Sequence, residues 1–214
     1  MKKNMKNNLI VAVLTVMMSV GFVPNTQAQE GYEGKRVYLD LGIGLSRYGI
    51  VNNFVYNSYG YDRYSLPTLR ANLTYGFNHF ISGGLYAGYN HYGWKGNDTY
   101  YSNGTYYPYE YKDRTSHLSI GARATFHIWA FLNKQLDLGL GVDQLDLYAS
   151  IMTGARIRTR TNVDKNLRTT STNVSPHFGP TVGAKYYFTN NMAVFVEAGY
   201  GSSSFGVFGI TFKF

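Results

Sequence analysis

The sequence of 214 residues contains no cysteine. This absence excludes disulfide bonds, thiolate metal sites and a lipid anchor on an N-terminal cysteine. Charged residues are also scarce, at 15%, against roughly 25% in ordinary soluble domains. Proline is sparse, with 5 residues, whereas glycine and tyrosine are abundant, with 24 and 21 residues. This composition favours a β-barrel over an ordinary soluble domain.

The first residues form the one long apolar run of the sequence. Three lysines precede an apolar stretch over residues 9–23, which ends in small residues around Ala28. A charged, an apolar and a small-residue region in this order are typical of a secretory signal peptide. A transmembrane helix is the weaker alternative, because the run is short and small residues end it. We predict a signal peptide over residues 1–28 and one mature domain over residues 29–214.

The mature chain lacks both strong charge and a second apolar run. Removal of the three signal lysines from 20 basic residues leaves 17 against 12 acidic residues, a balance of +5. This modest charge is no argument for a nucleic-acid partner, which an exported protein would seldom meet. No other apolar run approaches roughly eighteen residues, the length that a helical span needs. The exported chain is therefore either secreted or a membrane β-barrel.

Apolar residues alternate with small or polar ones in eight segments, which is the period of a β-strand. In the clearest segment, Leu39, Leu41 and Ile43 alternate with Asp40 and Gly42. The predicted strands are Val37–Ser46, Thr68–Phe77, Ile81–Asn90, Leu118–His127, Leu145–Met152, Pro176–Phe188, Val194–Tyr200 and Phe205–Phe214.

The connections between these segments differ in length. We predict long polar loops over residues 47–66, 94–114 and 156–168, and short turns after the second and sixth strands. Residues 128–144 are predicted to be a longer connection with some local structure. An even number of strands, with short turns at one end and long loops at the other, is typical of an outer-membrane barrel.

The less apolar face of the strands distinguishes a membrane barrel from a soluble β-sandwich. A solvated face would carry many lysines and glutamates, but this face carries Gly, Ser, Thr, Tyr and about one charge per strand. Charges of both signs can pair inside a narrow barrel of eight strands, which side chains nearly fill. Aromatic residues gather near the strand ends, as interfacial girdles do. We predict an all-β, eight-stranded, antiparallel, transmembrane up-and-down barrel with a polar network in its lumen: Asp40, Arg70, Arg123, Asp146, Lys185 and Glu197.

Four stretches carry a resemblance to a known class of proteins. They are residues 26–28, YLDLGIGLS at 38–46, GAKYYFTNNMAVFVEAGYG at 183–201 and GITFKF at 209–214. They resemble the small outer-membrane β-barrel (porin-like) proteins of Bacteroidetes-type bacteria, and the layout is similar to the OmpA transmembrane domain and OmpX. The resemblance implies insertion by the outer-membrane assembly machinery, which recognises a terminal aromatic strand. The matching residues here are Phe208, Ile210, Phe212 and Phe214.

The resemblance indicates an architecture more than an activity. We predict a non-enzymatic protein with a structural or surface-interaction role, a largely plugged polar interior and Tyr-rich extracellular loops. A narrow passive channel for ions or very small solutes is the alternative. A lipid-modifying enzyme is less favoured; its candidate residues would be Asp113, Ser116, His117, Ser175 and His177. The histidines lack metal-ligand spacing, so neither a metal nor a cofactor is predicted.

The expected partners follow from location and from two surface features. Arg156, Arg158 and Arg160 are candidate contacts for lipopolysaccharide phosphates, because a guanidinium group matches phosphate geometry; a merely solvated basic loop is the alternative. The Tyr-rich loops either bind an unidentified extracellular ligand or pack over the rim. We expect the outer membrane, its lipids and lipopolysaccharide, and its assembly machinery as the environment, with long loops extracellular, short turns periplasmic and no nucleic acid.

Overall fold

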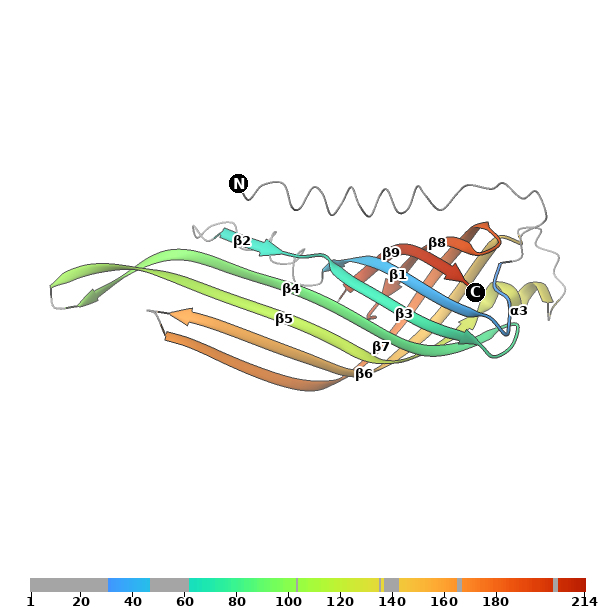
Figure 1. The fold of residues 1–214 in the computed structure, drawn as a ribbon, viewed down its shortest axis with the longest axis horizontal. Helices are drawn as coiled ribbons and strands as arrows, with labels where there is room; N and C mark the ends of the chain where they lie inside the picture. The colour runs from blue at the N-terminus through green and yellow to red at the C-terminus, as the bar shows by residue number, and fades with distance from the viewer. Residues whose placement is uncertain are drawn as a thin grey trace.

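Figure 1 shows the computed structural model of the chain. It describes residues 31–46, 62–102, 104–134, 136, 143–164, 167–201 and 204–214. The predicted signal peptide lies outside the described residues and stays a prediction. Among the described residues, no helix has the length and apolar character needed to cross a membrane.

Strands make up most of the described chain. They are β1 (Val37–Ser46), β2 (Asp62–Ser65), β3 (Thr68–Gly76), β4 (Ile81–Ser102), β5 (Thr105–His127), β6 (Leu145–Asp164), β7 (Leu167–Thr189), β8 (Met192–Gly199) and β9 (Ser204–Lys213). The helix α3 (Ile128–Lys134) joins β5 to the following segment.

The strands close into a ring of eight positions, each pairing antiparallel with its neighbours. The ring closes where β1 pairs with β3 on one side and with β9 on the other. β2 adds no further position, because it pairs with Tyr92–Lys95 of β4 directly beyond the part of β4 that pairs with β3. A closed ring leaves no strand edge unpaired. The predicted eight-stranded antiparallel up-and-down barrel is confirmed.

The two faces of the barrel wall are the reverse of those in a soluble protein. Leu73 and Leu85 point outward and are 52% and 66% exposed. Asn72 and Ser119 point inward and are 1% and 0% exposed. Exposed aliphatic side chains around a buried polar interior suit a surrounding of lipid rather than water. This inversion is the pattern of a transmembrane barrel.

The structure corrects the loops predicted after the third and fifth strands. β4 and β5 stay paired as far as Ser102 and Thr105, and β6 and β7 stay paired as far as Asp164 and Leu167. Both stretches are rich in Tyr and Thr, which favour strands, so the ladder continues after the apolar alternation has ended. Two long hairpins therefore extend well beyond the ring (Figure 1).

One strand is longer than predicted, and the connection over residues 128–144 contains local structure as predicted. The strand predicted to begin at Pro176 begins at Leu167, so that β7 passes through two prolines without ending. Pro180 has no backbone N–H, but its carbonyl accepts a hydrogen bond of 2.9 Å from the Tyr200 N–H. Part of the connection predicted over residues 128–144 is α3, which begins directly after β5.

The segment before β1 lies across the end of the barrel that carries the short turns. The Tyr32 hydroxyl lies 3.0 Å from the Asn78 carbonyl oxygen and 2.9 Å from that of Ile81. Glu33 Oε1 accepts a hydrogen bond of 2.6 Å from Lys213 Nζ. These contacts tie Tyr32 and Glu33 to the first turn and to the last strand, so this end of the barrel is covered.

The reversed faces predict how the barrel responds to charge on its outer wall. Leu85 lies mid-way along the apolar part of β4, so Leu85→Arg should lower the free energy of unfolding in lipid vesicles by about 2–4 kcal/mol. Tyr101→Arg, on the same face of β4 but near the tip of its hairpin, should change it by less than about 0.5 kcal/mol. Urea titration of the refolded barrels measures both. Equal effects of the two substitutions would argue that Leu85 faces water.

Candidate functional site

The interior of the barrel contains a glutamate held between two arginines. Glu197 of β8 lies 2.6 Å from Arg70 Nη1 of β3 and 2.6 Å from Arg123 Nη2 of β5. All three residues are at most 5% exposed. Arg123 also donates to Ser150 at 2.7 Å, and the Tyr148 hydroxyl donates to Glu197 at 3.2 Å. The cluster links strands on opposite sides of the ring.

A second buried ion pair lies beside it. Lys185 Nζ of β7 is 2.7 Å from Asp40 Oδ1 of β1. The Thr211 hydroxyl donates to the same oxygen at 2.8 Å, and the Asn72 amide donates to Asp40 Oδ2 at 3.3 Å. Three donors on three strands therefore satisfy one carboxylate, as a buried charge requires.

A third group of polar side chains lies at the covered end of the barrel. The Ser82 hydroxyl is 2.9 Å from His127 Nε2, and His127 Nδ1 is 2.9 Å from Asp146 Oδ2. The ring of Tyr32 stacks on His127 with centroids 3.4 Å apart. Serine, histidine and aspartate in this order are the arrangement of a hydrolase triad.

Burial argues against catalysis by this triad. Ser82 is 2% exposed and His127 is 3% exposed. The cavity that they share with Asp40 and Lys185 has a volume of about 10 Å³, about the lower limit for one water molecule. A substrate must come within hydrogen-bonding reach of the nucleophile and the base. The three side chains therefore act as a hydrogen-bonded link between β4, β5 and β6.

The structure brings together all six residues predicted for the lumen. Three are acidic and three are basic, each is at most 5% exposed, and they lie in the interior groups described above: Asp40, Arg70, Arg123, Asp146, Lys185 and Glu197. Sequence reasoning missed the partners Ser82, His127 and Tyr148. One signal was present: Ser82 and Asp146 lie near the start of their strands and His127 ends its strand, which places all three at one end of an antiparallel barrel.

The residues considered for catalysis are divided between the two faces of the sheet. Ser116 and His117 follow one another on β5, so their side chains point to opposite faces of the sheet. Ser116 points outward, where its hydroxyl is 2.8 Å from His91 Nδ1. His117 is 2% exposed on the inner face, and His177 on the same face is 6% exposed. The candidate nucleophile Ser116 therefore lies on the opposite face of the sheet from His117 and His177.

The three arginines predicted to contact lipopolysaccharide lie on the inner face of β6, at alternate positions in line with the buried Met152. Arg160 Nε donates to Asp113 Oδ2 at 2.7 Å, and Arg156 Nη2 lies 2.9 Å from His177 Nδ1. Arg158 shares their direction. Their contact with lipopolysaccharide stays an untested prediction, but the structure turns them toward the mouth of the barrel and away from the surrounding leaflet.

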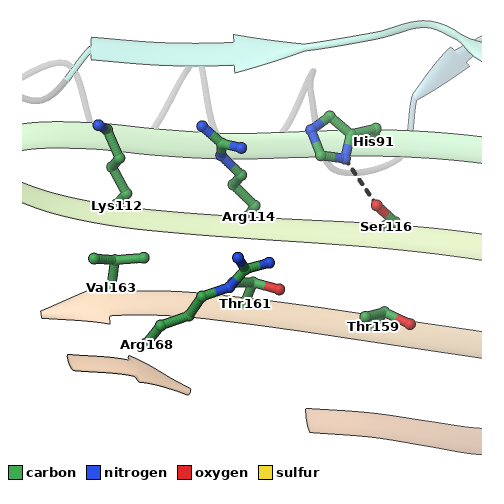
Figure 2. Close-up of a pocket in the computed structure, with 8 residues that line it drawn as sticks. All are labelled: His91, Lys112, Arg114, Ser116, Thr159, Thr161, Val163 and Arg168. Carbon is green, nitrogen blue, oxygen red and sulfur yellow. Dashed lines mark hydrogen bonds between the residues drawn. The ribbon is translucent and has the colours of Figure 1, made fainter. Parts of the chain in front are cut away.

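A pocket of about 300 Å³ lies on the outer face of the extended sheet. Figure 2 shows it, with Lys112 and Arg114 rising from β5 and the Arg168 guanidinium beside Thr161. The full lining is His91, Lys112, Arg114, Ser116, Thr159, Thr161, Val163 and Arg168. It combines three cationic side chains with hydroxyl groups and contains no carboxylate. Burial and the nearby Arg114 lower the pKa of His91, so the imidazole is neutral near pH 7.

Comparison with known proteins adds a fold-level likeness. Neither models of protein families nor curated proteins give a match. Among solved structures, the attachment invasion locus protein Ail of Yersinia pestis is 12% identical, with 86% of this chain and 100% of Ail covered and a TM-score of 0.44. The outer membrane protein OprG of Pseudomonas aeruginosa is 9% identical, with 87% and 99% covered and a TM-score of 0.45. The N-terminal β-barrel domain of OprF from the same species is 14% identical, with 86% and 100% covered and a TM-score of 0.41. At these TM-scores the likeness supports no inference about the function of this chain.

No metal site emerges from the described part of the chain. The structure contains no group of three or more His, Asp or Glu side chains there that could hold an ion. The interior groups described above are joined by ion pairs and hydrogen bonds between strands.

The buried glutamate predicts a large stability effect. Glu197→Gln leaves Arg70 and Arg123 facing each other without a counter-charge, so we expect a loss of about 3–5 kcal/mol in the free energy of unfolding. The half-exposed pair of Arg36 and Glu33 provides the control; Arg36→Gln should cost less than about 1 kcal/mol because solvent screens that pair. Urea titration in detergent micelles compares them. A Glu197→Gln barrel as stable as the control variant would refute a central role for this cluster.

Proposed function

We propose that this chain is a non-enzymatic outer-membrane β-barrel protein whose closed interior serves as a rigid scaffold for two long surface hairpins. The observation that carries the proposal is the pairing of an apolar outer wall with an interior in which acidic and basic side chains neutralise one another. The apolar outer wall suits a surrounding of lipid, and the neutralised interior favours a filled barrel over an open channel.

The apolar outer wall and the predicted signal peptide together support an outer-membrane location. The predicted signal peptide would export the chain, and the exposed aliphatic belt would then need a bilayer beyond the inner membrane. Phe208 and Phe214 are 57% and 67% exposed on the outer face of the last strand. They suit the proposed role as an assembly signal for the outer-membrane insertion machinery, as do Ile210 and Phe212 on the same face.

The orientation follows from the two ends of the barrel. The short turns and the covered end would face the periplasm, because long hairpins are carried on the extracellular side of such barrels. The hairpin of β4 and β5 would then display Tyr101 and Tyr106, which are 64% and 71% exposed, with ring centroids 5.0 Å apart. Exposed tyrosines offer rigid amphipathic contact area, which favours a surface-interaction role for this tip.

A narrow channel is the second candidate, and the filled interior argues against it. The ion pairs of Glu197 and Asp40 cross the lumen, and Tyr148 and Met152 are buried between the strands with exposures of 1% and 0%. In a ring of eight strands, such side chains nearly fill the lumen.

Single-channel recording tests the closed interior. The refolded mature protein should show no stable conductance steps in a planar bilayer, because ion pairs and buried side chains occupy the lumen. The double variant Asp40→Ala, Lys185→Ala removes an interior ion pair without changing the net charge, and should raise the frequency of conductance events. Stable, reproducible steps from the unaltered protein, with its barrel shown to be folded by heat-modifiable gel mobility, would contradict the scaffold proposal and favour a channel.

A further inference from the structure

We propose that the outer-face pocket around Arg114 and Arg168 binds the phosphate group of a lipid in the surrounding leaflet, namely the phosphate of lipid A. The inference rests on the proposed outer-membrane location and adds to it a specific site and a chemical class of ligand. Four observations carry it: the height of the pocket on the wall, the geometry of its donors, the charge of its lining and the direction of its side chains.

The pocket begins where the apolar belt ends. Along the outer face of β5, Ile120 and Leu118 are 44% and 39% exposed. The next outward positions are Ser116, Arg114 and Lys112, which line the pocket. A side chain just past the hydrocarbon belt stands at the level of the lipid headgroups, where phosphates lie. A cationic group at this height meets a lipid phosphate without leaving its place on the strand.

The donors of the pocket come from neighbouring strands that pairing holds in register. His91 faces Ser116 across β4 and β5, and Val163 faces Arg168 across β6 and β7. Figure 2 shows the Arg168 side chain crossing β6, which brings its guanidinium into the pocket that Arg114 also lines. Two planar guanidinium groups with hydroxyls between them can surround the oxygens of a phosphate.

The charge of the lining favours an anion. Among the described residues, neither Arg114 nor Arg168 forms an ion pair with a carboxylate, and the lining itself contains none. The inner face provides the contrast, because Arg160 there is already paired with the buried Asp113. Cationic guanidinium groups gathered around one pocket repel each other, and a bound phosphate would relieve that repulsion.

Tyr64 of β2 lies beside His91, which lines the site. Its ring lies 5.6 Å from the ring of His91. Its hydroxyl reaches over Gly93, the register partner of Arg114, so closely that a Cβ at Gly93 would lie 2.6 Å from it. The glycine therefore leaves room for a hydroxyl beside Arg114, where it can donate to a bound phosphate.

Lipid binding by the refolded mature protein tests the proposal. Native mass spectrometry from detergent with diphosphoryl lipid A should show binding that Arg114→Gln, Arg168→Gln together weaken by roughly tenfold or more. The matched control is Lys35→Gln, Arg36→Gln, which removes the same charge from the covered end of the barrel and should leave lipid A binding unchanged. Lipid A with both phosphates removed should bind the unaltered protein as weakly as diphosphoryl lipid A binds the outer-face variant.

Three results would overturn the proposal. They are equal weakening by the outer-face variant and the control variant, undiminished binding of dephosphorylated lipid A, and competition by inorganic phosphate as effective as that by lipid A. The last would make the site one for a free anion. Heat-modifiable mobility of each variant shows that its barrel is folded. A folded, non-conducting barrel that fails these lipid tests would refute this site alone and leave the proposed function standing.

Discussion

The barrel depends on the neutralisation of charge in its narrow, closed interior. Glu197 lies between Arg70 and Arg123, and these three residues come from three strands of the ring. A buried charge without a partner is far more costly than a complete pair. The ion cluster can form only when the ring is closed, because closure brings β3, β5 and β8 close enough for the Glu197 carboxylate to contact both guanidinium groups.

Closure of the ring also allows the outer wall to be apolar. Because every strand of the ring is paired on both sides, the wall needs no water to satisfy its backbone, and its outer face is free to be aliphatic. Along the outer face of β5, polar residues follow beyond Leu118, where Ser116, Arg114 and Lys112 line the pocket. The pocket around Arg114 and the exposed tyrosines of the hairpin tip both belong to this second zone.

The alternation of apolar and polar residues in the sequence predicts most strands of the ring. β1 begins and ends where the pattern predicts, and the inward positions of Asp40 and Glu197 follow from counting by two. The extended hairpins could not be predicted in this way, because both of their faces are polar. Without alternation of apolar and polar residues, the sequence pattern does not distinguish a strand from a loop. The same error left the direction of the arginines unpredicted. Because β6 continues past Arg156, and Arg156 is an even number of residues from Asp146, both side chains point inward. Contacts such as that of Ser82 with His127 depend on the stagger between strands, which a single sequence does not specify.

The lipid-facing wall is tested most directly by spin labels on single cysteines, for which a chain without native cysteine is well suited. Labels at Ile120, Ala122 and Ala124, in vesicles, should be accessible to oxygen and shielded from a water-soluble nickel chelate. A label at Arg114 should show the opposite preference, because it lies beyond the belt. Nickel access at all four positions, or exclusion of both reagents from Ile120, Ala122 and Ala124, would contradict a barrel with lipid outside.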